Sequence, residues 1–285
     1  MSPAIAMNCV QDTARWAAVA RAIESKRKDA LFRDPFAELF VGDQMAQLTE
    51  LSKQVGSVWP VVTRTVLLDR LLLNSIRDGV DAVLNLAAGY DTRPYRLALP
   101  QDLVWLDVDH AEVLAAKAQG LGNTKPSCVV ERHSVDLADE VARQGLLGLV
   151  KQRFARVLVL TEGLLYYLTM DAALQLAGEL HELHPQRWFF DIHNPALNRM
   201  ILKRSGKALQ GTATMHFASD RGAEVFEQAG WQVHSVTSTA KAAGKLGRLP
   251  WYLALLTKLP EPTYGRPNSP WAGVCTMIPI PLQPV

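Results

Sequence analysis

Short apolar runs alternate with amphipathic helical patterns through the middle of this chain, and no other feature constrains its fold as strongly. The runs fall at residues 82–86, 103–108, 128–135, 156–161 and 187–192. Each has the length and composition of a strand that is buried on both faces. A helical pattern over 171–184 separates the last two runs. This alternation predicts βαβ units and therefore a mostly parallel sheet with helices on both faces.

The two ends of the chain extend this α/β core. Helical patterns precede the first strand over 12–27, with Asp12 or Thr13 as the N-cap, and over about 64–76. After a short helix at 220–229, two more strands are expected to pair antiparallel at one edge of the sheet, at 231–237 and 273–280. The sequence thus predicts a seven-stranded, Rossmann-like sheet.

The whole chain, 1–285, is expected to form one domain, with an N-terminal helical part at 1–77 and an inserted cap at 195–218. Residues 240–272 hold prolines, lysines and aromatic residues without periodicity, and no element is assigned to them. A hydrophobic fraction of 48% is enough to bury a large core.

Composition also limits the partners of this chain. No apolar run approaches the roughly 20 residues that span a bilayer, and the N-terminus has no signal-peptide pattern, so a cytoplasmic protein without a membrane partner is expected. The net charge is +2 and the basic residues are scattered, which argues against nucleic acid as the main partner. Three widely spaced cysteines without a C-x-x-C pair predict no metal site. The oligomeric state is left open.

The segment after the first strand is the expected ligand site, because such sheets bind ligands at the carboxyl ends of their strands. Residues 85–94 read NLAAGYDTRP. Small residues at 87–89 allow close approach of a ligand, and Asp91 or Thr92 before Pro94 can cap a helix.

The charge of this segment indicates which ligand it binds. It lacks glycines at G-x-G-x-x-G spacing, with Gly89 as its one glycine, and Asp91 would occupy the helix N-terminus where a pyrophosphate sits, so NAD and FAD are disfavoured. S-adenosylmethionine has no phosphate and carries a cationic ammonium and sulfonium, so it suits an acidic loop. About twenty residues later the second strand ends in Asp107 and Asp109, where a carboxylate can accept both ribose hydroxyls. A helix cap is the alternative role for either residue.

Three further side chains are expected near the same edge. Glu162 follows an apolar strand, where an unpaired buried carboxylate is costly and therefore calls for a cationic partner. Tyr166 follows the fourth strand and His193 ends the fifth. Both can line a substrate site, although packing or capping are the ordinary roles of such residues.

Read in order, these residues and others resemble the leucine carboxyl methyltransferase family, especially its bacterial branch of small-molecule O-methyltransferases. The resemblance spans about residues 12–237. It rests on ordered blocks: Thr13-Ala14, Arg21-Ala22, Glu24-Ser25, Asp34-Pro35, Arg64-Thr65, Ala88 to Arg93, Arg96-Leu97, Asp107 to Asp109, Val135 to Leu137, Glu162 to Leu168, and Gly230-Trp231.

The resemblance implies that S-adenosylmethionine is the cofactor. It implies that Arg64 contacts the methionine carboxylate, that Glu162 faces the ammonium, and that Asp109 holds the ribose. Asp136 and Leu137 would border the adenine.

The loop with Ala87 and Gly89 would cradle the methionine part of the cofactor, with Asp91 and Asp107 completing the acidic surroundings. Where the family often has glycine, this chain has Ala87, whose methyl group requires a negative φ.

The sequence therefore predicts O-methylation of a carboxylate or hydroxyl of a small molecule, in secondary metabolism of the polyketide type. Methyl transfer is an in-line displacement that depends on positioning. A carboxylate acceptor needs no base, whereas a hydroxyl needs one, for which His193 or Tyr166 are the candidates. Two alternatives stay open: methylation of a protein C-terminal carboxylate, and cofactor binding without turnover. An NAD-dependent oxidoreductase is a weaker third.

Overall fold

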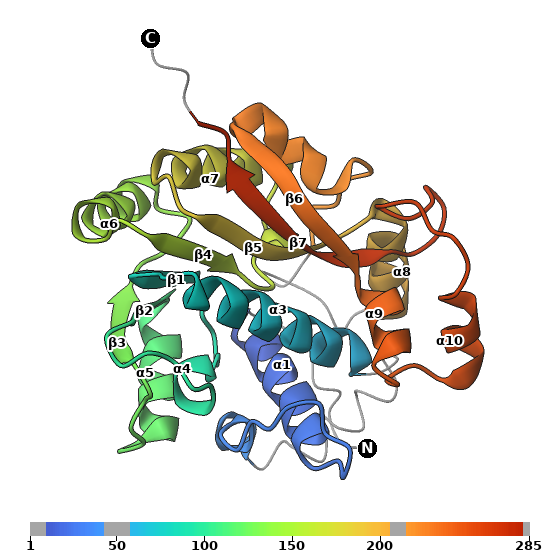
Figure 1. Cartoon of the computed structure of the whole chain (residues 1–285), viewed down its shortest axis with the longest axis horizontal. Coiled ribbons are helices and arrows are strands. Elements are labelled where there is room, and N and C mark those ends of the chain that lie inside the picture. Colours follow the sequence, from blue (N-terminus) through green and yellow to red (C-terminus); the bar gives the residue numbers. More distant parts are fainter. Residues whose placement is uncertain (1–9, 43–57, 206–214, 282–285) are drawn as a thin grey trace.

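The computed structural model describes residues 10–42, 58–205 and 215–281. Seven strands form one sheet in the order β3-β2-β1-β4-β5-β7-β6 (Figure 1). Their bounds are β1 (Ala82–Leu86), β2 (Val104–Asp109), β3 (Val129–Ser134), β4 (Val157–Thr161), β5 (Arg187–His193), β6 (Trp231–Ser238) and β7 (Ala272–Pro279). Strands β1 to β5 pair in parallel, which confirms the mostly parallel sheet.

The last two strands pair antiparallel at one edge of the sheet, which confirms the sequence prediction. Within the pair, β7 is the inner strand: it lies between β5 and β6 and is antiparallel to both. Although β7 comes last in the sequence, it occupies an inner position, and β6 is the outermost strand of the sheet.

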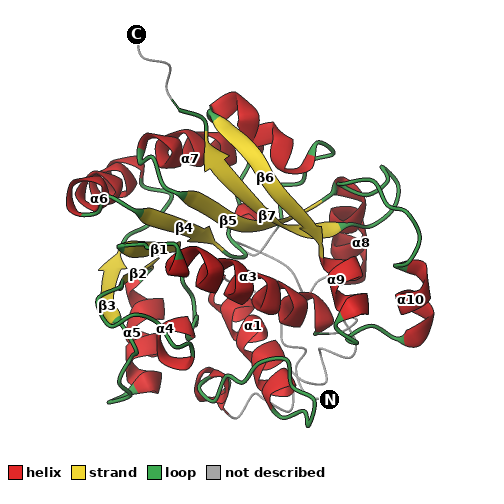
Figure 2. Cartoon of the chain, viewed as in Figure 1, coloured by secondary structure: helices red, strands yellow, loops and turns green. Residues whose placement is uncertain are grey.

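Helices cover both faces of the sheet (Figure 2). They are α1 (Val10–Ser25), η1 (Ala37–Phe40), α3 (Trp59–Arg77), α4 (Arg93–Arg96), α5 (Ala111–Leu121), α6 (Glu140–Arg153), η3 (Leu165–Tyr167), α7 (Met170–Glu182), α8 (Pro195–Ser205), η6 (Gly222–Ala229), α9 (Thr239–Lys245) and α10 (Trp251–Leu256).

Helix α1 begins at Val10, so Asp12 and Thr13 lie inside the helix and the predicted N-cap is wrong. Helix α3 begins at Trp59, five residues before the predicted start, with Pro60 in its first turn. The unassigned region 240–272 contains most of α9 and all of α10.

The two faces of the sheet have separate apolar cores. On one face, Trp188, Phe190 and Ile192 of β5 pack with buried side chains of α6, α7 and η6. On the other, Phe189 packs with side chains of α3 such as Leu68. Because side chains alternate along a strand, the residues two and four positions after Phe189 also point to the α3 face.

The carboxyl ends of the parallel strands meet at one edge of the sheet. The register pairs Leu86 of β1 with Val108 of β2, so the loop after β1 begins beside the end of β2. Helix α3 ends at the amino ends of the strands, where the chain enters β1. The N-terminal half of α3 therefore lies close to the carboxyl ends of the strands (Figure 1). The edge is therefore bordered by loops from several strands and by α3.

The predicted cap at 195–218 is only partly visible. Helix α8 covers 195–205, residues 206–214 lie outside the described residues, and the cap remains a prediction, as does the N-terminal part at 1–77. Within the described residues, no helix has the length and apolar character needed to cross a bilayer.

Candidate functional site

Arg64 of α3 lies at the carboxyl edge and holds two carboxylates from neighbouring strands. Its Nε donates to Oε1 of Glu162 at 2.8 Å, and its Nη1 donates to Oδ2 of Asp191 at 2.6 Å. Burial disfavours the guanidinium charge, but Asp191 and Glu162 outweigh it and raise the pKa of Arg64. The helix thus brings a buried cation to the ends of β4 and β5.

Arg93, at the start of α4, is the second buried cation of this site. Its Nε lies 2.7 Å from Asp69 on α3, and its Nη1 lies 2.5 Å from Asp91 and 2.8 Å from Oε2 of Glu162. Glu162 therefore joins Arg93 to Arg64. Although burial opposes its ionisation, these two arginines lower the pKa of Glu162, so it is an anion at neutral pH.

Asp91 is the acid that the sequence places at the start of the helix after β1. Its Oδ1 accepts a hydrogen bond from the backbone nitrogen of Arg93 at 2.8 Å, but the N-cap position of α4 is occupied by Thr92, so Asp91 lies one residue before the cap. Burial opposes its charge, but Arg93 and Lys117 prevail and lower the pKa of Asp91 to about 2. Asp91 is thus held ionised beside Glu162, with Arg93 between them.

The connected charges at this edge do not cancel. Three arginines, Arg64, Arg93 and Arg96, are linked to four carboxylates, Asp69, Asp91, Glu162 and Asp191. One negative charge is left over among these groups. A buried surplus of this sign favours a cationic ligand.

The loop after β1 approaches β2 closely. The nitrogen of Ala88 donates to the carbonyl oxygen of Val108 at 3.0 Å, and the nitrogen of Gly89 donates to Oδ2 of Asp109 at 2.7 Å. Both Ala87 and Gly89 have positive φ, +54° and +48°. The expected negative φ of Ala87 is therefore wrong: the chain turns sharply after β1, and the hydrogen bonds of the next two residues to β2 hold this conformation.

The two aspartates at the end of β2 have different roles. Asp107 is fully buried and salt-bridged to Lys117 at 2.6 Å, and its other oxygen accepts from Trp105 and Asn85. The structure therefore contradicts a direct ligand contact for Asp107, which instead positions its neighbours.

Asp109 is buried at this edge, but less completely than Asp107. It is 8% exposed and accepts from the nitrogens of Gly89 and His110. Burial raises its pKa, which these two backbone donors only partly offset. A strand-end carboxylate with limited exposure beside a tight loop can accept the hydroxyls of a ribose.

Asp136 and Leu137 follow β3, the next strand outward. Asp136 is exposed and its Oδ1 accepts from the nitrogen of Ala138 at 2.9 Å. Leu137 is half-buried, and its carbonyl oxygen accepts from Arg143 at 2.5 Å. The structure places both residues at the carboxyl edge, where their predicted adenine contact stays a prediction.

Tyr166 and His193 stack on each other beside Arg64. Their ring centroids lie 4.5 Å apart with 18° between the planes, and the Tyr166 hydroxyl donates to Oδ2 of Asp191 at 2.6 Å. Burial and then the charge of Asp191 raise the pKa of Tyr166. Burial lowers the pKa of His193 to about 4, so both side chains are neutral at neutral pH.

Sequence reasoning missed Asp191, which lies at the centre of this arrangement. Besides Arg64 and Tyr166, its carboxylate accepts from the nitrogen of Gly163 at 2.7 Å. A signal was present, because an acid near the end of an apolar strand is costly without partners. Arg93 and Asp69 were also given no role, since their partners, apart from Asp91 beside Arg93, are distant in sequence.

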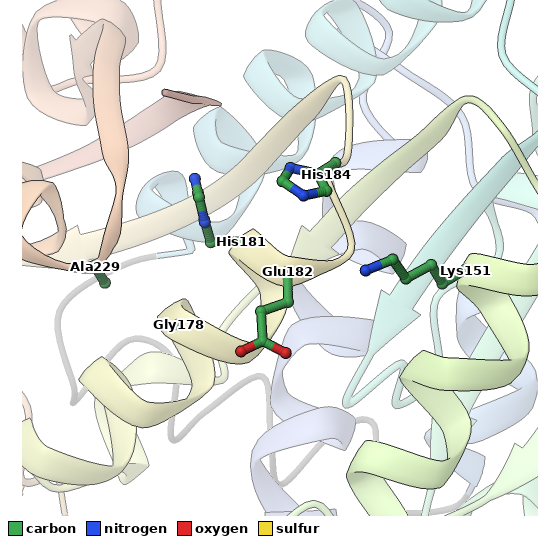
Figure 3. Close-up of a pocket in the computed structure, with 6 residues that line it drawn as sticks. All are labelled: Lys151, Gly178, His181, Glu182, His184 and Ala229. Carbon is green, nitrogen blue, oxygen red and sulfur yellow. The ribbon is translucent and has the colours of Figure 1, made fainter. Parts of the chain in front are cut away.

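A hollow on the opposite edge of the sheet differs from this site. It has a volume of about 430 Å³ and is lined by Lys151, Gly178, His181, Glu182, His184 and Ala229 (Figure 3). These residues come from the C-terminal parts of α6, α7 and η6 and from the turn after α7. Among the described residues, no group of three or more His, Cys, Asp or Glu side chains is arranged to hold a metal ion.

Comparison with known proteins assigns the chain to a family. The model of the leucine carboxyl methyltransferase family matches residues 14–181, which is more than half of the chain. The chain belongs to the leucine carboxyl methyltransferase family. A relative in Saccharopolyspora erythraea, named as a candidate S-adenosyl-L-methionine-dependent methyltransferase, is 31% identical over 253 residues, which cover 81% of this chain and 86% of the relative.

Other relatives and a solved structure agree with this membership. A protein of Mycobacterium marinum with the same kind of name is 29% identical, over 83% of this chain and 84% of its own. A crystal structure of a DUF574 family protein from Streptomyces avermitilis covers 93% of this chain and 97% of that chain, with a TM-score of 0.56 and 14% identity. That structure confirms the fold alone.

Family membership fixes the general activity. The chain is an S-adenosylmethionine-dependent methyltransferase, and S-adenosylmethionine is its cofactor. The residues described above fit this ligand, because a surplus negative charge, a strand-end carboxylate and a tight loop of small residues meet at the carboxyl edge. The weaker NAD-dependent interpretation finds no support here.

Proposed function

We propose that this chain is an O-methyltransferase that acts on a carboxylate or hydroxyl of a small molecule, in secondary metabolism of the polyketide type. The observation that carries the proposal is the linked cluster of Arg64, Arg93, Asp91, Glu162 and Asp191 at the carboxyl edge. S-adenosylmethionine carries one net positive charge, which matches the single negative charge left over in the cluster.

The strand order supports an arrangement for the cofactor. Asp136 and Leu137 after β3 would border the adenine, and Asp109 after β2 would hold the ribose. The methionine part would then reach the loop after β1, with Glu162 at its ammonium and Arg64 at its carboxylate. The acceptor would meet the methyl group further along, at the ends of β4 and β5.

The side chains at that end favour an acceptor that is already ionised. His193, with a pKa near 4, is a weak base, and Tyr166 donates its hydroxyl to Asp191 rather than accepting a proton. A carboxylate is ionised at neutral pH and needs no base, and S-adenosylmethionine, when bound, would supply the methyl group to its oxygen and leave as a neutral thioether. Among the two acceptor types, a carboxylate fits these groups best.

A titration of the purified protein with S-adenosylmethionine, after removal of co-purified cofactor, tests the basis of the proposal. Product formation is then measured with pairs of small molecules that differ only in carrying a carboxylate or a hydroxyl. At saturating S-adenosylmethionine, kcat/KM for a carboxylate acceptor is expected to stay level from about pH 6 to about pH 9, because carboxyl groups titrate near pH 4. Failure to bind the cofactor would refute the proposal, and binding without any product would favour the non-catalytic alternative.

Methylation of a protein C-terminal carboxylate is the second candidate, favoured by the family whose model matches residues 14–181. Peptides that end in a free carboxylate, compared with the same peptides amidated, separate it from the first. Product from the free peptides alone would establish the protein substrate.

A further inference from the structure

The cofactor loop is held from its outer side by the N-terminal part of the chain. Nη2 of Arg21, on α1, donates to the carbonyl oxygen of Tyr90 at 2.6 Å, and its Nε donates to Oδ2 of Asp34 at 2.8 Å. The hydroxyl of Thr92 donates to the same Asp34 oxygen at 2.7 Å. Arg21, Asp34 and Thr92 are 8%, 1% and 0% exposed. Two residues that flank Asp91 are thus tied to one buried ion pair.

Asp34 is itself held in place by local hydrogen bonds. Its backbone nitrogen donates to the hydroxyl of Ser25 at 2.8 Å, and its Oδ1 accepts from the nitrogen of Phe36 at 3.1 Å. The Ser25 hydroxyl in turn donates to the carbonyl oxygen of Arg21 at 2.7 Å. The end of α1 and the turn after it therefore form one unit.

Apolar contacts also join the N-terminal part of the chain to the loop after β1. A methyl group added at Gly89 would lie 3.2 Å from Cβ of Ala14 on α1, so helix and loop are in close contact there. The rings of Phe40 and Tyr90 stack with centroids 4.6 Å apart. The outer side of residues 89–92 is therefore covered by residues 10–42.

Thr92 has a role that helix formation does not require. It occupies the N-cap position of α4, yet its side chain does not cap that helix. Its hydroxyl donates a hydrogen bond to Asp34 instead. The nitrogen of Arg93, the first residue of α4, donates to Asp91, which lies one residue before the N-cap. The Thr92 hydroxyl therefore serves the junction with the N-terminal part.

We infer that Arg21 and Asp34 are positioning residues for the cofactor, acting through Tyr90 and Thr92 on the loop at residues 87–91. The inference rests on the proposed cofactor site. Without Asp34, the loop loses the fixed partner that keeps Asp91 facing Arg93 and the nitrogen of Gly89 facing Asp109. Because coupling between two sites is reciprocal, bound cofactor must in turn stabilise the docking of α1.

Substitutions at Thr92 test the link without breaking the ion pair. Thr92→Val keeps the shape and removes the hydroxyl, and it is expected to raise the Kd for S-adenosylhomocysteine about tenfold, equivalent to about 1.4 kcal/mol. Thr92→Ser keeps a hydroxyl at this position, and its Kd should lie within about twofold of the wild-type value. A purely structural role would give valine and serine the same affinity, and that result would overturn the inference.

The ion pair is tested with Arg21→Lys, because lysine cannot reach Asp34 and the Tyr90 carbonyl with two separate nitrogens. We expect the Kd to rise about tenfold. The matched control is Arg156→Lys, which changes an exposed arginine paired with Asp81 at the other edge of the sheet and should change the Kd less than about twofold. Equal values of Kd in the two variants would contradict the assignment.

The wild-type protein provides a test that does not depend on the folding of any variant. Lys26, Arg27 and Lys28 are exposed just after α1 and are sites for trypsin. Saturation with S-adenosylhomocysteine should slow cleavage there, and an unchanged rate would overturn the coupling. If the wild-type protein does not bind S-adenosylhomocysteine at all, the proposed cofactor site is wrong as well. If the wild type binds and the variants at Thr92 and Arg21 have an unchanged Kd, this inference alone is wrong.

Discussion

Glu162 joins the two arginines of the site, and its charge is the one most directly linked to cofactor binding. Both of its oxygens are engaged, one by Arg64 and one by Arg93. We predict that Glu162→Gln raises the Kd for S-adenosylmethionine at least about tenfold, because a charge-assisted hydrogen bond is worth about 1.5–3 kcal/mol. Isothermal titration calorimetry measures the change.

Glu131→Gln is the matched control for that variant. Glu131 lies on β3 and pairs with the exposed Arg153, so the same chemical change there should leave the Kd within about twofold. Equal losses of affinity in the two variants would indicate a general electrostatic effect and contradict the role of Glu162.

Ala87 adopts a conformation that suits glycine better. Its φ of +54° costs an alanine about 1–2 kcal/mol, part of which is offset by the lower entropy of alanine in the unfolded chain. Ala87→Gly is therefore expected to raise the free energy of unfolding by about 0.5–1 kcal/mol in urea denaturation.

The neighbouring Ala88 provides the contrasting substitution. Ala88 is buried and its φ is not positive, so Ala88→Gly should lower the free energy of unfolding by about 0.5–1 kcal/mol. Opposite signs at adjacent positions are the expected signature. Stabilisation by both substitutions, or by neither, would show that the strain at Ala87 has been misjudged.

Part of this site was predictable at the level of single residues. Asp109 ends β2 and Glu162 directly follows β4, so their position at the carboxyl edge follows from the pattern of apolar strands alone. The contacts of Arg93 with Asp69 and Glu162 could not be predicted in this way, because Asp69 lies 24 residues away on α3 and Glu162 lies in the turn after β4. The positive φ of Ala87 also depends on contacts with β2 that no local pattern reveals.

At the scale of elements, a buried ion pair connects α5 to β2. Lys117 and Asp107 are both 0% exposed and lie 2.6 Å apart. We predict that Lys117→Met lowers the free energy of unfolding by about 3–5 kcal/mol, because it leaves a buried carboxylate without its counter-ion. Chemical denaturation with two spectroscopic probes measures the loss.

Adding Asp107→Asn to Lys117→Met removes the stranded charge. The double variant should recover part of the lost stability, since an amide oxygen can still accept from Trp105. If the double variant is less stable than Lys117→Met alone, the uncompensated charge is not the cause of the loss.

The strands were more predictable than the helix ends. Each strand is a compact apolar run whose composition differs from its surroundings, whereas α3 begins at Trp59 without a capping side chain. Helices α9 and α10 have seven and six residues, too few for periodicity to stand out among prolines and lysines. The placement of β7 between β5 and β6 depends on pairing across the sheet.

At the scale of the whole molecule, the two edges of the sheet are chemically different. The carboxyl edge has linked charges and a tight loop, and the amino edge has the open hollow with Lys151 and His184 (Figure 3). Along the carboxyl edge, the strand order β3-β2-β1-β4-β5 runs from the expected adenine contact after β3 to the stacked rings of Tyr166 and His193 beside β5.

This polarity leads to a prediction about hydrogen exchange. Saturation with S-adenosylhomocysteine should slow amide exchange in the segments that follow β1, β2, β3 and β4, because ordered loops at a binding site open less often. Segments at the amino edge, including the turn at 78–80 and the residues around His184, share the same sheet and serve as the internal control. Protection at both edges would mean that the ligand stabilises the fold as a whole, and protection centred on the hollow would place the cofactor there instead.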